Sequence, residues 1–195
     1  WLLVGYLFGS VSSAIVVCRA LGHADPRTVG SGNPGTTNVL RLFGKGPATL
    51  TLAGDVAKGV IPVSVCALSG AEPLAIALAG TGAFLGHLYP LFFGFAGGKG
   101  VATLVGVLLA FNAWLGLAFM GSWIAVALVT RYSSLSALSA TVMAPIFGVM
   151  LGVPSPVVAA ICVMGVFVFW RHQSNIRNLL SGKEGKIGKS KNKTE

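Results

Sequence analysis

Long apolar runs set the first limit on how this chain can fold. They cover residues 1–21, 47–70, 73–93, 101–130, 134–152 and 155–170. Runs of about 20 apolar residues match the hydrocarbon thickness of a bilayer, roughly 30 Å. Only 10% of the residues are charged, whereas soluble domains carry about 25%. The chain is therefore predicted to be an all-α integral membrane protein, with residues 1–195 forming a single multi-pass domain.

The region 101–130 allows two topologies, and the distribution of charge decides between them. It is either one overlong helix or a hairpin of two short helices. With the hairpin, the chain has seven spans, and all 14 Lys and Arg residues fall on one side or at that end of a span. A single helix would separate Arg131 and the basic tail from Arg27 and Arg41, against the positive-inside bias. We therefore predict a seven-transmembrane helical bundle with its N-terminus outside and its C-terminus cytoplasmic.

Residues 1–21 are interpreted as the first of these spans rather than as a cleaved signal peptide. Arg19 follows the apolar stretch instead of preceding it, and no convincing cleavage site comes after it. The polar stretches 22–46, 94–100 and 171–184 then all emerge on the cytoplasmic face. Chemistry is expected where these three segments meet, with short interfacial helices on that side.

The net charge of +9 favours anionic partners of a particular kind. The chain lacks the aromatic stacking surfaces and basic domain typical of nucleic-acid binding, so no nucleic acid is predicted. Anionic lipid headgroups fit the basic cytoplasmic tail, 184–195, and an anionic substrate fits the loops. No CxxC spacing or metal-ligand cluster is present in the sequence. We predict no metal or cofactor and no obligate protein partner.

The first polar segment, Gly30–Arg41, reads GSGNPGTTNVLR. It matches the GxGxxG dinucleotide pattern, but a membrane helix precedes it where that pattern requires a strand, so we predict no nucleotide binding. Its glycines can still turn backbone N–H groups toward one anion. Side-chain donors are added by Ser31, Asn33, Thr36, Thr37 and Asn38.

A short helix is predicted to follow this loop. Thr37 or Asn38 would cap it, and Gly44 would end it after Phe43. Its apolar side chains, Val39, Leu40 and Phe43, would lie against the membrane. Arg41 would lie off that face, free to pair with a phosphate or, in a purely structural loop, with lipid headgroups.

The second polar segment, 94–103, reads GFAGGKGVAT and is not a Walker loop. Gly97, Gly98, Lys99 and Gly100 open a predicted helix, where backbone donors and one ammonium can hold a phosphate. A cation at a helix start opposes the helix dipole unless an anion is also bound there. This conflict favours an anion site over a basic membrane anchor.

The third segment, RHQSNIRNLLSGKE at 171–184, is predicted to continue the last span as a helix. His172 and Asn175 are three residues apart and share one face, with Ser174 and Arg177 beside them. Histidine is the side chain best suited to accept a proton near neutral pH. The alternative is an interfacial cluster that contacts lipid headgroups.

Two further sites of charge lie within the apolar runs. Asp55 and Lys58 are three residues apart on one helical face and can pair, either for function or as a structural ion pair. His87, in GHLYP, is expected to have a packing or interfacial role.

These motifs, taken in order, resemble one family. GSGNPGTTNVLR, GDVAKG at 54–59, GHLYPLFFGFAGGKGVAT at 86–103 and RHQSNIRNLLSGKE are similar to the bacterial acyl-phosphate:glycerol-3-phosphate acyltransferases (PlsY) along essentially the whole chain. The resemblance implies a multi-pass enzyme of the bacterial cytoplasmic (inner) membrane. Such an enzyme moves a fatty acyl group from acyl phosphate to the 1-hydroxyl of glycerol 3-phosphate. The products are lysophosphatidate and phosphate, in the first acylation of phospholipid synthesis.

The resemblance also suggests roles for the motif residues. Ser31, His172 and Asn175 are expected to be catalytic, with His172 or the substrate's own phosphate taking the proton from the attacking hydroxyl. Glu184 is expected to order the third segment. The expected substrate-binding residues are Gly30, Gly32, Asn33, Gly35, Thr36, Asn38, Arg41, Lys58, Gly97, Gly98, Lys99, Gly100, Arg177 and Glu184. The rival class is a transporter or binding protein for an organic phosphate.

Overall fold

In a computed structural model of the chain, residues 1–187 are described, and their regular structure is helical. A short 3-10 helix, Leu91–Phe93, precedes the glycine-rich loop. The α-helices are α1 Leu2–Gly9, α2 Ser13–Ala20, α3 Thr36–Phe43, α4 Lys45–Leu68, α5 Pro73–Leu88, α6 Val101–Phe111, α7 Ala113–Thr130, α8 Ser133–Met150, α9 Ser155–Arg171 and α10 Gln173–Leu180.

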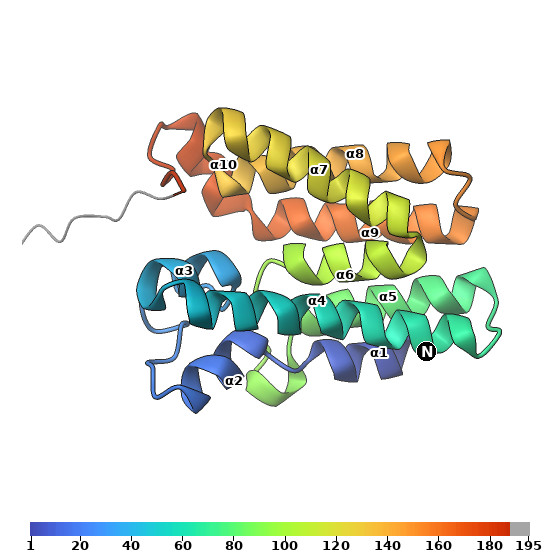
Figure 1. The fold of residues 1–195 in the computed structure, drawn as a ribbon, viewed down its shortest axis with the longest axis horizontal. Coiled ribbons are helices and arrows are strands. Elements are labelled where there is room, and N and C mark those ends of the chain that lie inside the picture. Colours follow the sequence, from blue (N-terminus) through green and yellow to red (C-terminus); the bar gives the residue numbers. More distant parts are fainter. Residues whose placement is uncertain (188–195) are drawn as a thin grey trace, which may run out of the picture.

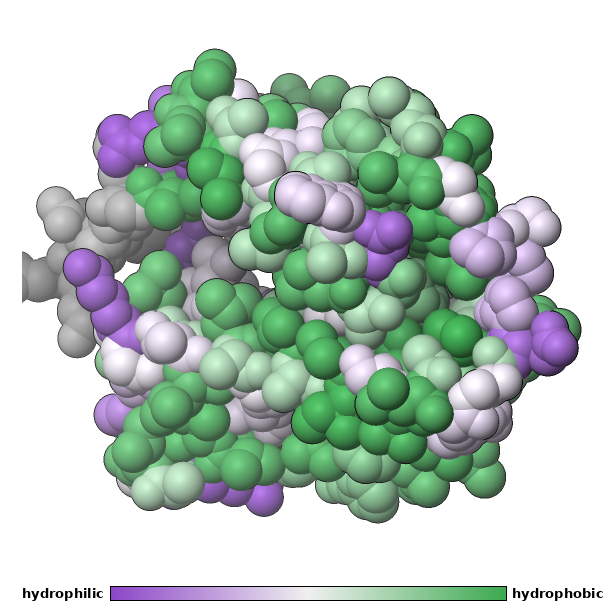
Figure 2. Space-filling view, turned by 45° about the vertical axis from the view of Figure 1, so that its right-hand side comes forward, coloured by the Kyte–Doolittle hydropathy of each residue, from purple (hydrophilic) through white to green (hydrophobic). Residues whose placement is uncertain are grey.

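The long helices run side by side in two groups (Figure 1). One group holds α7, α8 and α9, the other holds α1, α2, α4 and α5, and α6 lies between them. The main buried cluster joins α4, α5, α6, α7, α8 and α9, and its largest members include Phe84, Leu104, Phe119 and Ile161. Figure 2 shows hydrophobic side chains over much of the visible surface, with hydrophilic residues gathered mostly toward its ends.

The helices confirm the predicted class of all-α integral membrane protein. Within residues 1–187, five helical stretches are long and apolar enough to cross a membrane, or six if α9 and α10 count as one bent span. The remaining apolar helix, α6, has 11 residues, so its length is only about 16 Å at 1.5 Å per residue. The seven-span count and the orientation of the termini stay predictions.

The division of residues 101–130 into two helices is confirmed. α6 ends at Phe111 and α7 begins at Ala113, and the two helices pack against each other. The side chain of Asn112 caps α7, because its Oδ1 accepts hydrogen bonds from Trp114 N at 2.9 Å and Leu115 N at 3.2 Å. An Asn in an apolar run is therefore the local signal that divides this region.

The first apolar run is not one continuous helix, as its hydropathy had suggested. It breaks at residues 10–12 into α1 and α2. Backbone groups freed inside an apolar region must find new partners. At this break, the Val11 carbonyl accepts a hydrogen bond from Lys58 Nζ of α4 at 2.9 Å. The break depends on a distant residue, so no pattern within 1–21 marks it.

The predicted cap of α3 is wrong, although its end at Phe43 and Gly44 is confirmed. Gly35 occupies the N-cap position and makes no side-chain cap. The Asn38 side chain turns back to the preceding loop instead. Val39 is fully buried rather than membrane-facing, because α3 packs against α4 and buries it near Cys18.

The last span also departs from the predicted continuous helix. α9 ends at Arg171, α10 begins at Gln173, and their axes differ by 59°. His172 lies at this bend and is buried. The bend directs α10 across the end of the bundle, where it contacts α8 and α9.

Glycines allow α1 and α5 to approach backbone to backbone. A Cβ atom at Gly82 would overlap the Leu2 carbonyl of α1, and one at Gly5 would overlap the Ala79 carbonyl of α5. Close packing through small residues is how helices associate in lipid, where apolar burial gives little drive. The contact fixes α5, and with it the start of the loop that carries Lys99.

We expect Gly82→Ala to destabilise the protein by about 1–3 kcal/mol, since the added methyl group must push two backbones apart. The matched control is Gly121→Ala, in α7, where a Cβ meets no atom within 4 Å. The control should be neutral or slightly stabilising, because Ala favours helix over Gly. Thermal unfolding in detergent measures both, and equal melting temperatures for the two variants would contradict the close contact.

Candidate active site

The loop before α3 is held in shape by Asn38. Its Oδ1 accepts a hydrogen bond from Ser31 N at 3.0 Å, and its Nδ2 donates to the Pro26 and Val29 carbonyls at 2.9 and 3.3 Å. Gly30 has φ +65° and lies so close that a Cβ atom would meet Asn38 Oδ1. In this structure, the Asn38 amide supports the loop, and its expected role in substrate binding stays a prediction.

The other polar groups of this segment remain around the loop. Ser31 and Gly32 are exposed, and Asn33, Gly35 and Thr36 are half-buried. The Thr36 hydroxyl is buried and has no hydrogen-bond partner among the described residues. Thr37 Oγ1 lies 3.4 Å from Ser133 Oγ, which brings α3 against the start of α8.

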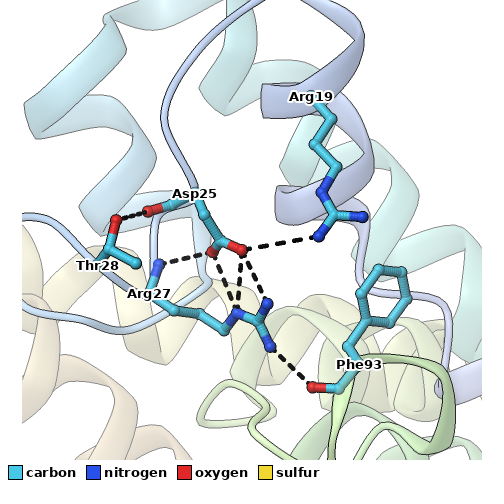
Figure 3. A network of polar contacts seen from close by, with 5 residues as sticks. All are labelled: Arg19, Asp25, Arg27, Thr28 and Phe93. Atoms are coloured by element: carbon cyan, nitrogen blue, oxygen red, sulfur yellow. Dashed lines mark hydrogen bonds and ion pairs between the residues drawn. The ribbon is translucent and has the colours of Figure 1, made fainter.

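Arg27 connects the polar stretch 22–46 to the residue directly before the second segment. Figure 3 shows the Asp25 carboxylate between Arg19 and Arg27, with Arg27 reaching on to the Phe93 carbonyl. Arg27 donates to both Asp25 oxygens at 2.8–3.3 Å and to Phe93 O at 2.7 Å. The hydrogen bonds from Arg27 lower the pKa of Asp25 below its usual value. The pair is therefore present at neutral pH and is lost only as the pH falls through that lowered value.

The backbone of the glycine loop in the second segment is hydrogen-bonded on two sides. On one side, Arg171 donates to the Gly97 carbonyl at 2.7 Å and to the Gly98 carbonyl at 3.1 Å. On the other side, Gly98 N–H donates to the His87 carbonyl at 3.2 Å. A Cβ atom at either glycine would overlap His87. Close packing explains these two glycines, and the Gly98 donor predicted for a phosphate is already in use.

Lys99 extends from this loop to the third segment. Its ammonium donates to Asn175 Oδ1, and Asn175 Nδ2 donates to Glu184 Oε1 at 2.7 Å. Ser134 Oγ donates to the same Glu184 oxygen at 2.6 Å. Burial lowers the pKa of Lys99, while the charge of Glu184 opposes that shift. Glu184 thus accepts hydrogen bonds from α8 as well as α10, and its expected role in ordering the third segment stays a prediction.

His172 has one ring nitrogen fixed by the backbone. Its Nδ1 lies 2.8 Å from the Val168 carbonyl. Because a carbonyl only accepts, Nδ1 must carry a proton, and the neutral ring then presents Nε2 as an acceptor. A neutral imidazole in this tautomer can take a proton at Nε2.

Arg41 joins the first segment to Gly185, the residue directly after the third segment. Its guanidinium donates to the Gly185 carbonyl at 3.2 Å, and the Arg41 side chain is exposed. Beyond Gly185, Ile187 N donates to the Arg131 carbonyl at 2.7 Å. The structure therefore brings Arg41, Lys99, Asn175 and Glu184 to one end of the bundle, with His172 at the bend beneath them.

Two expected site residues take no part in the hydrogen bonds of this cluster among the described residues. Lys58 is buried in α4, where its Nζ lies 2.9 Å from Asp55 Oδ1. Arg177 is exposed on α10. Both assignments to substrate binding stay predictions.

Sequence reasoning missed Arg171 and Ser134. Arg171 directly precedes His172 at the end of a span, where it resembles an ordinary interfacial anchor. Ser134 follows a turn in which Arg131 has φ +63°, and a serine at a helix start normally suggests capping. Neither residue type distinguishes these roles, since both depend on which loop lies opposite.

Similar proteins of known family give the context for this cluster. A glycerol-3-phosphate acyltransferase family model matches residues 1–182. A glycerol-3-phosphate acyltransferase of Thioalkalivibrio sulfidiphilus is 53% identical over 194 residues, covering 99% of this chain and 96% of the relative. That of Ralstonia nicotianae is 53% identical, covering 98% of this chain and 95% of the relative.

Solved structures agree in fold. The crystal structure of PlsY, an integral membrane glycerol 3-phosphate acyltransferase, in its glycerol 3-phosphate form has a TM-score of 0.92 and 38% identity. The match covers 96% of this chain and 94% of the PlsY chain. The lysophosphatidic acid form has a TM-score of 0.90 and 37% identity, with coverages of 96% and 93%. This chain therefore belongs to the glycerol-3-phosphate acyltransferase family, as a multi-pass enzyme of the bacterial inner membrane.

Proposed function

We propose that this enzyme uses acyl phosphate as its donor and acylates the 1-hydroxyl of glycerol 3-phosphate. The products are lysophosphatidate and phosphate. The observation that supports this most is the meeting of Lys99, Arg41 and Asn175 at one end of the bundle. Both substrates carry a phosphate group, and an ammonium and a guanidinium suit that group.

Glycerol 3-phosphate would bind at Lys99 and Arg41. In this structure, Lys99 donates to the Asn175 side chain and Arg41 donates to the Gly185 carbonyl. Both acceptors are neutral, so a phosphate oxygen would be the stronger partner for each cation. The crystal structure of the PlsY relative with glycerol 3-phosphate supports this choice of ligand. Ser31, Asn33 and Thr36 would hold the acyl phosphate from the opposite loop, and Glu184 would keep Asn175 in place.

The reaction needs one bond made, one broken and one proton moved. The hydroxyl oxygen attacks the acyl carbonyl carbon, and the bond from that carbon to the phosphate oxygen breaks. The proton goes to His172 Nε2 or directly to the departing phosphate. Acyl phosphate is already activated, so positioning and charge stabilisation supply much of the rate. We place these steps at the cytoplasmic boundary, where a seven-span topology gathers the basic residues.

The donor choice has a direct test. Purified protein in detergent should form lysophosphatidate from acyl phosphate and glycerol 3-phosphate, and should form none from acyl-CoA. Turnover without sealed vesicles would exclude a pure transporter of organic phosphates. Comparable rates with acyl-CoA would contradict the proposed donor.

Lys99→Ala should raise KM for glycerol 3-phosphate by roughly 10- to 100-fold, because a hydrogen bond from a charged group contributes about 1.5–3 kcal/mol. KM for acyl phosphate should change far less. Lys45→Ala removes an exposed ammonium at the start of α4 and serves as the control, with both KM values unchanged. An unchanged KM for glycerol 3-phosphate in Lys99→Ala would refute the placement of this substrate.

His172→Ala should lower kcat by about 10²- to 10⁴-fold if this imidazole takes the proton. His172→Gln should fail equally, because an amide cannot act as a base at neutral pH. The measurement is steady-state kcat with both substrates saturating. A variant that retains kcat and changes only KM would favour proton transfer to the phosphate leaving group instead.

A further inference from the structure

A buried charged group on α4 faces the last turn of α5. Asp55, Lys58 and His87 are 2%, 6% and 6% exposed. Lys58 Nζ lies 2.9 Å from Asp55 Oδ1, and His87 Nδ1 lies 3.6 Å from the same oxygen. Charges are rarely buried in an apolar interior without a partner or a function. The proposed acyl transfer uses none of these three side chains in its chemistry.

The position of His87 connects this group to the glycine loop. The His87 carbonyl accepts the Gly98 N–H, and the His87 ring fills the space that a Cβ atom of Gly98 would occupy. The ring is thus in contact with the residue directly before Lys99. Its Nδ1 has no hydrogen-bond partner among the described residues, so Asp55 is the polar group that faces it.

We propose that Asp55 is a positioning residue that acts through His87 to place Lys99 for glycerol 3-phosphate. The inference rests on the proposed role of Lys99 as a ligand of that substrate. Asp55 acts on the His87 ring through the charge that it presents 3.6 Å from Nδ1, and the ring packs against Gly98. Lys58 holds the other side of Asp55 and at the same time joins it to the Val11 carbonyl.

The hydrogen bonds that hold Gly98 allow a movement of the His87 ring to reach Lys99. Arg171 holds the Gly98 carbonyl, and the His87 backbone holds its N–H. With both backbone groups fixed, a shift of the His87 ring cannot be absorbed by free rotation of the loop. It moves the next residue, Lys99, relative to Asn175. Displacements of about 1 Å in a positioned group can cost roughly 10²-fold in rate.

Asp55→Asn tests the inference because it keeps the shape of the side chain and removes its charge. KM for glycerol 3-phosphate should rise about tenfold, while KM for acyl phosphate should stay within about twofold. A merely structural role would reduce the amount of folded enzyme, and so the apparent kcat, with both KM values unchanged. That result would overturn the inference.

Two further variants provide a second test of the inference and a matched control. His87→Gln leaves the Asp55–Lys58 pair intact and should give the same rise in KM, even if Asp55→Asn fails to fold. Thr51→Val is the matched control, since Thr51 is buried on α4 one turn before Asp55, and its hydroxyl has no partner among the described residues. A rise in KM for Thr51→Val equal to that for His87→Gln would overturn the inference.

A double variant tests the route. Gly98→Ala pushes a methyl group onto the His87 ring from the other side and should also raise KM for glycerol 3-phosphate. If both changes act through that ring, the combination of Gly98→Ala with His87→Gln should raise KM no more than the larger single effect. Changes that multiply would show independent action and would overturn the route through His87.

The outcome for Lys99 separates this inference from the function on which it rests. If Lys99→Ala leaves KM for glycerol 3-phosphate unchanged, the proposed substrate site is wrong. If Lys99→Ala raises that KM and His87→Gln does not, the substrate site stands and only the positioning role of Asp55 and His87 falls.

Discussion

The apolar surroundings of the helices require every backbone polar group to find its partner inside the protein. This constraint explains why the regular structure in residues 1–187 is helical and why most loops lie between the candidate membrane spans rather than inside them. The exception is the break between α1 and α2. There the freed Val11 carbonyl is satisfied by Lys58, whose own charge is balanced by Asp55. The Lys58 ammonium therefore links a buried ion pair in α4 to a backbone irregularity between two neighbouring helices.

The same constraint separates what sequence could predict from what it could not. Hydropathy identifies the apolar helices because each one must be long and uninterrupted by charge. Asn112 likewise divides residues 101–130, since its side chain caps α7 locally. The α1–α2 break and the bend at His172 have no local signal. At the α1–α2 break the Val11 carbonyl is satisfied by Lys58 of α4, and a tertiary contact of this kind leaves no periodic pattern in the segment that it reshapes.

The sequence predicts that the three polar segments meet, but it does not predict which contacts the individual residues make there. Charge distribution placed Arg41, Lys99 and Asn175 on one predicted face, and the structure brings them to one end of the bundle. Glycine patterns suggested open backbone donors. Instead, Gly97 and Gly98 are small because His87 packs against them, and Arg171 uses their carbonyls. A glycine that frees an N–H and a glycine that makes room for a ring look the same in sequence.

This difference changes how the loop can recognise a phosphate. A nest of free N–H groups binds an anion through backbone that no substitution of side chains alters. Here the Gly98 N–H and the Gly97 and Gly98 carbonyls are held by α5 and α9, so in the proposed site the Lys99 side chain would be the group that recognises the phosphate. A flexible ammonium is a weaker positioning device than fixed amides. In the proposed site, the position of the ammonium would then be set by neighbours such as Asn175 and by the loop that packs on His87, and in this way the buried residues around His87 would contribute to substrate recognition.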